Sequence, residues 1–261
     1  MKLCIVSVFK NESHALKEWL DHYIREGVDT FLLTDNGSTD EYQTILEPYI
    51  QSGHVVLIIN PKKHAQIEHL NYYLKNAKKM DWVIVVDLDE FIYARRGFTT
   101  IKEYLKTLPS DVHKIHIPWK LFGSSGLKQQ PTSIIQHFIH RRKYTEPLPI
   151  LVGKKSILRG KHLNHLELHN SITEKSYTIT SDNKDIYEED YFIECTEQLL
   201  NNSFLHLNHY RIQSWEWFKT NKMNRSDAHT KNYDNIRNKQ YFDFFDYFDT
   251  IDTELKNKKY W

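Results

Sequence analysis

Apolar and polar stretches alternate regularly through the first 95 residues of the chain. Four runs, at 3–9, 30–34, 54–60 and 82–87, are almost continuously apolar and rich in β-branched residues. Such runs predict strands that are buried on both faces, as in a parallel sheet. Helical spacing at 16–24, 41–51 and about 64–79 predicts helices between them, the first ending at Gly27. This alternation predicts a doubly wound, mostly parallel α/β sheet.

The pattern loosens after residue 95. Residues 113–126 predict a strand and a glycine-bearing loop, 132–169 contain short strand-like pieces, and 212–240 look helical and polar. The chain shows no internal repeat and no low-complexity linker. We therefore expect a single domain with a C-terminal helical elaboration.

Composition narrows the possible partners and compartment. The net charge of +1 gives no overall field that would favour nucleic acid. The apolar run at 3–9 is too short for a signal peptide, and nothing approaches the roughly 18 apolar residues of a membrane span. Cys4 and Cys195 lack metal-ligand spacing, so we expect free thiols in a reducing compartment. Together these features predict a cytoplasmic protein.

The C-terminal tail offers a limited route to a membrane. Aromatic residues at 241, 244, 245 and 248 have helical spacing, which predicts a helix packed on the domain. Residues 255–261 combine three lysines with Tyr260 and Trp261. We expect this end to make at most a weak peripheral contact with an anionic membrane.

The most informative motif is DLDEF at 87–91, directly after the apolar run VIVV. At a strand-to-loop turn, Asp87 and Asp89 can both address one hard divalent cation, for which oxygen ligands suit Mg²⁺ or Mn²⁺. Such a cation would neutralise a diphosphate leaving group. The structural alternative is an acidic loop that caps a helix.

Two further polar clusters also follow predicted strands. They are KNE at 10–12 and DNGSTD at 35–40. Because ligands of doubly wound sheets bind beyond the carboxyl ends of the strands, we expect both clusters and the acidic motif to meet at one edge. Asp35 could accept hydrogen bonds from a nucleotide base or ribose, or it could only stabilise its own turn.

The order of these pieces resembles that of the family 2 and family 92 glycosyltransferases. The resemblance is carried by KNESHALKEWLDHYIREGVDTFLLTDNGSTD, followed about 50 residues later by WVIVVDLDEF. It is close over 3–95 and patchy later, at WKLFGSSG, KKSILRG, His169 and LNHYRIQSWEWFKTNK. The matching positions are Asn11, Glu12, Glu18, Trp19, Gly27, Asp35, Asn36, Ser38, Asp40, Gln66, Asp87, Asp89 and Glu90.

The resemblance implies a glycosyltransferase A fold and a function in glycan or polysaccharide biosynthesis. It implies that residues 1–95 bind a nucleotide sugar, UDP-linked by the weight of the family, that 96–210 form the acceptor and catalytic half, and that 211–261 are a helical extension. The acceptor would be a glycan or a lipid-linked sugar. Transfer would invert the anomeric carbon and depend on Mn²⁺ or Mg²⁺.

Individual roles follow from the same resemblance. Asn11, Glu12, Asp35, Gln66 and Asp87 would bind the nucleotide, Asp87 and Asp89 the metal, and Asp89 and Glu90 would lie at the catalytic centre. A late histidine would complete the metal site, with His169 favoured over His209. Inversion needs a general base, for which order along the chain suggests Glu146, with Glu167 and Asp227 as alternatives.

The basic residues at 154–161 have two interpretations. Lys154, Lys155, Arg159 and Lys161 could contact the diphosphate. The alternative is a solvated basic strand edge.

Other classes of protein fit less well. A dehalogenase-type phosphatase should carry Thr or Val where this chain has Phe91, and a nucleotidyltransferase needs glycines that residues 7–16 lack. The first strand is followed by no G-x-G-x-x-G, which argues against a dinucleotide-binding oxidoreductase. A non-catalytic relative that binds a carbohydrate or nucleotide is the main alternative.

Overall fold

The computed structural model describes residues 1–145, 150–174, 177–186, 191–223 and 237–260. Its N-terminal half alternates strands and helices as the hydrophobic pattern predicts. In chain order these are β1 (Leu3–Phe9), α1 (Ser13–Arg25), β2 (Thr30–Asp35), α2 (Tyr42–Gln51), β3 (Val55–Ile59), α3 (Gln66–Tyr72), α4 (Leu74–Ala77), β4 (Trp82–Val85), β5 (Glu90–Ala94) and α5 (Ile101–Thr107).

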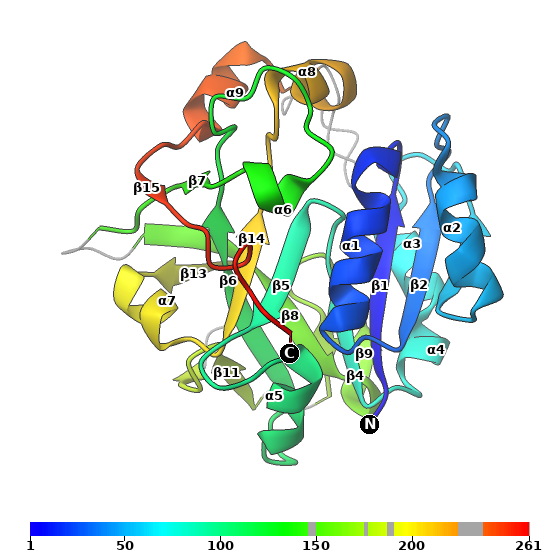
Figure 1. Ribbon diagram of the computed structural model, residues 1–261. Helices are drawn as coiled ribbons and strands as arrows, with labels where there is room; N and C mark the ends of the chain where they lie inside the picture. Colours follow the sequence, from blue (N-terminus) through cyan, green and yellow to red (C-terminus); the bar gives the residue numbers. More distant parts are fainter. Residues whose placement is uncertain (146–149, 175–176, 187–190, 224–236, 261) are drawn as a thin grey trace.

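The first four strands form a parallel sheet in the order β3-β2-β1-β4. Their carboxyl ends all lie on one edge of the sheet, toward the top of Figure 1. Side chains of β1 alternate between two packed layers. Leu3 and Ile5 join the cluster that contains the buried face of α1, whereas Cys4 and Val6 pack with residues of α3 and α4. Burial on both faces explains why the run at 3–9 is almost continuously apolar.

The second half extends this sheet with mixed strand directions. Its elements are β6 (Lys114–Leu121), α6 (Ile134–His137), β7 (His140–Arg141), β8 (Ile150–Arg159), η1 (Gly160–His162), β9 (Leu163–His165), β10 (Ile172–Thr173), β11 (Thr178–Thr180), β12 (Asp185–Ile186), β13 (Phe192–Cys195), α7 (Glu197–Asn202), β14 (Leu205–His209), α8 (Trp215–Trp217), the short π-helix η2 (Phe218–Lys222), α9 (Lys239–Phe245) and β15 (Thr250–Ile251). β8 lies antiparallel between β4 and β6, and β14 pairs with β5 and β6. The predicted α/β class is confirmed.

Two helical predictions need correction. The helix expected at about 64–79 is divided into α3 and α4 at Tyr73, whose buried hydroxyl donates a hydrogen bond to the Leu33 carbonyl. The described part of 212–240 forms α8, η2 and the first residues of α9 rather than one long helix. Residues 132–169, expected to contain short strand-like pieces, also contain the ten-residue strand β8.

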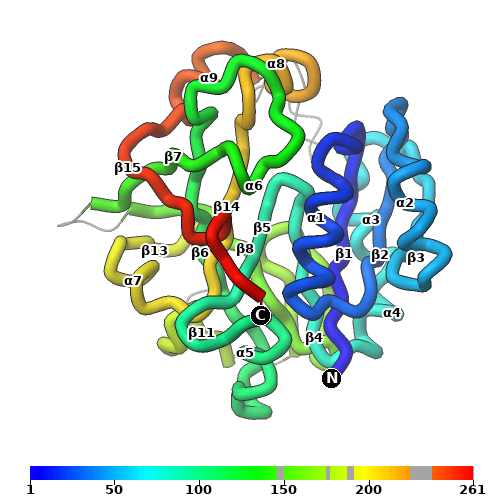
Figure 2. The backbone as a smooth tube through the Cα atoms, viewed as in Figure 1, coloured from blue at the N-terminus to red at the C-terminus, as the bar shows by residue number. Residues whose placement is uncertain are grey.

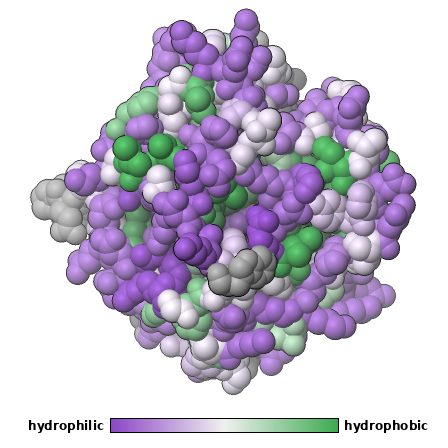
Figure 3. Space-filling view, in the orientation of Figure 1, coloured by the Kyte–Doolittle hydropathy of each residue, from purple (hydrophilic) through white to green (hydrophobic). Residues whose placement is uncertain are grey.

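The C-terminal tail crosses the front of the molecule and ends beside β5 (Figures 1 and 2). Helix α9 packs on the domain through Phe242, whose ring centroid lies 5.0 Å from that of Trp215. The aromatic spacing predicted other positions, and of these Phe244 and Phe248 are exposed. Farther along, Leu255 is buried and Lys258 Nζ lies 3.0 Å from Glu26 Oε1. The face drawn in Figure 3 is largely hydrophilic, with apolar residues in separate patches. Among the described helices, none has the length and apolar character needed to cross a membrane.

Candidate active site

The acidic motif occupies the short turn between β4 and β5, and helix α1 fixes its backbone. The Trp19 indole N–H lies 3.1 Å from the carbonyl oxygens of both Asp87 and Glu90, and donates to them. The Tyr23 hydroxyl donates to the same Glu90 carbonyl at 3.0 Å. Both aromatic side chains are fully buried. The Glu-Trp helix of the sequence motif therefore holds the turn that carries the carboxylates.

Lys155 of β8 neutralises one side of the motif. Its Nζ lies 2.8 Å from Asp87 Oδ2 and 3.3 Å from Glu90 Oε2. The side chains of Lys155 and Glu90 are both 0% exposed, whereas that of Asp87 is 35% exposed. Glu90 Oε2 also accepts a hydrogen bond from the Asp87 backbone N–H at 2.9 Å. The structure thus places Glu90 beneath the turn, where it positions Asp87, and leaves Asp87 open to a ligand.

A second lysine and a histidine flank Asp89. Lys222 Nζ lies 2.5 Å from Asp89 Oδ2, and His209 Nε2 lies 3.6 Å from Asp89 Oδ1. His209 belongs to β14, and its other ring nitrogen, Nδ1, is buried without a hydrogen-bond partner. Lys222 ends η2. Three distant segments therefore meet at one carboxylate.

This arrangement shifts the pKa values of two neighbouring carboxyl groups in opposite directions. Burial raises the pKa of Glu90 to about 8, although Lys155 opposes the shift. Burial also acts to raise the pKa of Asp89, but Lys222 and His209 outweigh it and hold that pKa well below its usual range. Asp89 is therefore a permanent anion, as a metal ligand must be, whereas Glu90 binds a proton near neutral pH.

The two candidate metal-binding histidines both lie against the ring of Trp119. Its ring centroid is 4.4 Å from that of His209 and 5.3 Å from that of His169. Both nitrogens of His169 are engaged: Nδ1 lies 3.0 Å from the Lys154 carbonyl oxygen and Nε2 lies 3.0 Å from the Tyr191 hydroxyl. Contrary to the order suggested by the resemblance, the geometry favours His209 as the histidine that addresses the motif.

Adjacent residues of β8 point to opposite faces of the sheet. Lys155 faces the acidic motif, whereas Lys154 Nζ lies 3.1 Å from His116 Nε2. Both lysines are fully buried, so the solvated basic edge is wrong for this pair. Of these two candidates for a diphosphate contact, the structure brings Lys155 to the acidic motif and places Lys154 on the other face of the sheet.

The loops after β1 and β2 are tied together beside the motif. Asn11 has left-handed backbone geometry with φ of 55°, uncommon for a residue other than glycine. Its N–H donates to Ser38 Oγ at 2.9 Å, and its Oδ1 accepts from the Thr39 N–H at 2.7 Å. The Ser13 N–H donates to Asp40 Oδ2 at 2.8 Å. These contacts give the Asn, Ser and Asp positions of both sequence motifs a structural role.

Asp35, Glu12 and Gln66 border the same edge of the sheet. Asp35 is buried and accepts hydrogen bonds from the Ser38 N–H at 2.8 Å and the Tyr42 hydroxyl at 3.0 Å. Gln66 Nε2 lies 3.5 Å from Asp87 Oδ1. Glu12 lies at the N-terminus of α1. The expected convergence of the polar clusters is therefore present.

Of the three candidate general bases, the structure describes only Glu167. Glu146 and Asp227 lie outside the described residues. Glu167 Oε1 is 3.1 Å from His165 Nε2. Glu18, which belongs to the sequence motif, binds the N-terminus of α6 through the Ile134 N–H at 2.6 Å.

The donor chemistry of the motif suits Mn²⁺ or Mg²⁺, because Asp87 and Asp89 offer carboxylate oxygens and His209 an imidazole nitrogen, Nε2, that lies 3.6 Å from Asp89 Oδ1. Among the described residues, no three His, Cys, Asp or Glu side chains form a ready cluster for a metal ion. Each aspartate is paired with an ammonium group instead. Asp89 Oδ2 is occupied by the Lys222 ammonium.

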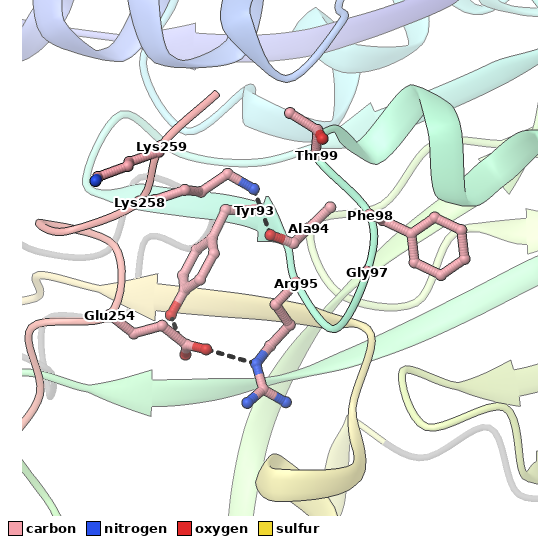
Figure 4. A pocket seen from close by; sticks show the side chains of 9 residues that line it. All are labelled: Tyr93, Ala94, Arg95, Gly97, Phe98, Thr99, Glu254, Lys258 and Lys259. Carbon is pink, nitrogen blue, oxygen red and sulfur yellow. Dashed lines mark hydrogen bonds and ion pairs between the residues drawn. The ribbon is translucent and has the colours of Figure 1, made fainter. Parts of the chain in front are cut away.

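A hollow of about 340 Å³ lies at the opposite end of β5. Figure 4 shows Glu254 between Tyr93 and Arg95, and Lys258 directed to the Ala94 carbonyl. The Arg95 Nε–Glu254 Oε1 distance is 2.7 Å. These contacts fasten the C-terminal tail to the end of β5, and the hollow is separate from the acidic motif.

Curated relatives and solved structures give matches of low identity. A glycosyltransferase family 92 protein of Ricinus communis is 23% identical over 91% of this chain and 40% of its own length, and one of Arabidopsis thaliana is 25% identical over 84% and 36%. The chain thus spans less than half of these relatives. TarS 1–349 of S. aureus in complex with UDP-GlcNAc has a TM-score of 0.43 and 16% identity, covering 72% of this chain and 60% of that one. GalNAc-T7 with UDP, GalNAc and Mn²⁺ has a TM-score of 0.46 and 11% identity, covering 82% and 45%.

The family assignment rests on a broader match. The model for the family described as Glycosyltransferase family 92 matches residues 1–242, which include the acidic motif, both tied loops and η2. The chain belongs to glycosyltransferase family 92.

Proposed function

We propose that this chain transfers a sugar from a UDP-linked donor to an acceptor hydroxyl, with inversion at the anomeric carbon. The observation that carries the proposal is the convergence of Asp87 and Asp89 with the loops after β1 and β2 at the carboxyl edge of the sheet. Nucleotides bind at this edge in doubly wound sheets. Membership of the family supports the reaction class, and the choice of UDP follows the sequence resemblance.

Charges at the site suit a diphosphate leaving group. When bound, a divalent cation at Asp87 and Asp89 would offset the negative charge that develops on that group. Lys155 orients Asp87 from the buried side, and Trp19 holds the backbone of the turn. Asp35 and the tied loops would receive the nucleoside. The protein thereby provides a preorganised polar surface before the donor arrives.

Inversion requires a single in-line displacement. The bond from the anomeric carbon to the phosphate oxygen breaks as the acceptor oxygen attacks from the other side, and the acceptor proton passes to a carboxylate base. Glu146 and Asp227 are the candidates for that base outside the described residues. A glycan or lipid-linked sugar provides the acceptor hydroxyl in this proposal.

A donor screen tests the proposal. The protein is incubated with Mn²⁺, a mixture of glycans and single nucleotide sugars, and release of the nucleoside diphosphate is measured. We expect turnover with a UDP sugar, and inverted stereochemistry in the product by NMR. Donor binding by calorimetry with no turnover for any donor and acceptor would contradict the proposal and favour a non-catalytic binding relative.

A further inference from the structure

Lys222 makes an unusual set of contacts for a lysine at the end of a short helix. Its Nζ lies 2.5 Å from Asp89 Oδ2 and donates to the Arg211 carbonyl oxygen at 2.8 Å. It also lies 4.9 Å from the centroid of the Trp217 ring. The side chain is 13% exposed. Lys222 is therefore the direct counter-ion of the aspartate that the proposed reaction needs as a metal ligand.

The two lysines of the site differ in how firmly they are held. Lys155 is 0% exposed and belongs to β8, which is hydrogen-bonded to β4 and β6 on its two sides. Lys222 ends the five-residue helix η2 and keeps contact with solvent. A long, flexible ammonium side chain in this position can change partners without moving the sheet. Lys155 is thus the fixed cation of the site and Lys222 the movable one.

A divalent cation and Lys222 compete for the same carboxylate. Asp89 Oδ2 already accepts the Lys222 ammonium, and a cation bound to Asp89 would repel an ammonium group a few ångströms away. The displaced ammonium would remain largely buried beside Trp217, where losing its anionic partner is costly. It therefore needs another anion, and the diphosphate bound through the same cation is the nearest one in the proposed reaction.

We propose that Lys222 is an exchangeable counter-ion, which pairs with Asp89 in the empty site and moves to the donor diphosphate when a divalent cation takes Asp89. The inference rests on the proposed function, since it assumes a metal-bridged diphosphate. It gives Lys222 opposite effects on metal affinity and on nucleotide affinity. Lys222 weakens metal binding in the absence of nucleotide and strengthens nucleotide binding in the presence of metal.

The opposite signs make the test specific. Lys222→Met removes the charge and keeps most of the stem, Lys222→Arg keeps a charge, and Lys219→Met removes an exposed lysine from the same short helix. The first measurement is Mn²⁺ affinity without nucleotide, by electron paramagnetic resonance of free Mn²⁺. Lys222→Met should bind about tenfold more tightly, because a charge-assisted hydrogen bond to Asp89 no longer has to be broken. Lys219→Met should match the wild type.

The second measurement is UDP affinity at saturating Mn²⁺, by calorimetry. Lys222→Met should bind UDP about tenfold more weakly, because it lacks the ammonium that meets the diphosphate. Lys222→Arg should stay closer to the wild type in both measurements. Thermal unfolding of each variant checks that the fold is retained.

The possible outcomes distinguish a failure of this inference from a failure of the proposed function. Changes of Mn²⁺ and UDP affinity in the same direction would show a structural role and overturn the exchange. If the wild type binds Mn²⁺ and Lys222→Met leaves that affinity unchanged, the exchange is overturned, whereas metal-dependent transfer is not. Absence of Mn²⁺ binding in every protein, with and without UDP, would overturn the exchange together with the metal dependence of the proposed function.

Discussion

Replacing Lys155 with Met is a direct test of how the acidic motif is held. The change removes the ammonium between Asp87 and Glu90 but keeps an apolar stem in a fully buried position. Removing one partner of a buried ion pair costs about 3–5 kcal/mol of unfolding free energy. Because Glu90 can bind a proton in compensation, we expect the lower end, about 3 kcal/mol at pH 7.

The loss should grow at alkaline pH. Burial raises the pKa of Glu90 to about 8 from a reference value of 4.5. Between these pH values the folded state keeps a proton that the unfolded state has lost, so the free energy of unfolding falls as pH rises. Lys155 lowers the pKa of Glu90, and without it the decline continues above pH 8. Burial lowers the pKa of Lys155, but Asp87 and Glu90 raise it above its usual range, so Lys155 itself stays charged in this window.

The difference from wild type should therefore increase above about pH 8, by up to about 1.4 kcal/mol per pH unit. Urea unfolding followed by tryptophan fluorescence at pH 6.5 and 9.0 measures it. Lys161→Met, at an exposed position just beyond the same strand, is the matched control and should change stability little. A loss below about 0.5 kcal/mol for Lys155→Met, or an equal loss at both pH values, would refute this account of the buried pair.

Three further substitutions test the surroundings of the motif. A Cβ at Gly153 would lie 2.3 Å from the Trp119 ring, so Gly153→Ala should lower stability by about 1–3 kcal/mol in thermal unfolding, and an unchanged midpoint would contradict the close packing. Asp35→Ala should weaken UDP binding by about 1–3 kcal/mol in calorimetry, while Tyr42→Phe, which keeps the Asp35 charge, should weaken it less. Equal UDP affinity in the Asp35 variant and the wild type would leave Asp35 a purely structural role.

The N-terminal half of the fold was predictable because its signals are local. Strands buried on both faces need continuous apolar runs, and the run before Asp87 is such a strand. The carboxyl ends of parallel strands share an edge, so the meeting of the three polar clusters followed from strand direction alone. The helical face that carries Trp19 was also visible as spacing, although its hydrogen bonds to the acidic turn were not.

The cations of the site were harder to predict because long-range contacts decide their burial. Lys155 lies 68 residues from Asp87 along the chain and Lys222 lies 133 residues from Asp89. A Gly-Lys-Lys run looks like a solvated edge until β8 is placed between two other strands. The sequence contained one signal for these lysines. Three carboxylates directly after a buried strand need cations from elsewhere in the chain to balance their charge.

The choice between the two histidines shows the same limit. Both occur in segments that resemble the family, and their spacing from the acidic motif does not separate them. The pairing of β14 with β5 brings His209 directly opposite Glu90, within reach of Asp89. His169 is instead saturated by the Lys154 carbonyl and Tyr191. Sheet register, which the sequence does not reveal, makes the distinction.

The central claim is that Asp89 is an ionised ligand at the reaction centre, and Asp89→Asn tests it most directly. The measurement is Mn²⁺-dependent release of UDP from the UDP sugar that the donor screen identifies, with Asp81→Asn, at an exposed position, as control. Asp89→Asn keeps the shape but removes a charge, so the rate should fall at least about a hundredfold, and excess chelator should abolish wild-type turnover. Turnover of Asp89→Asn at the wild-type rate, undiminished by excess chelator, would contradict the claim.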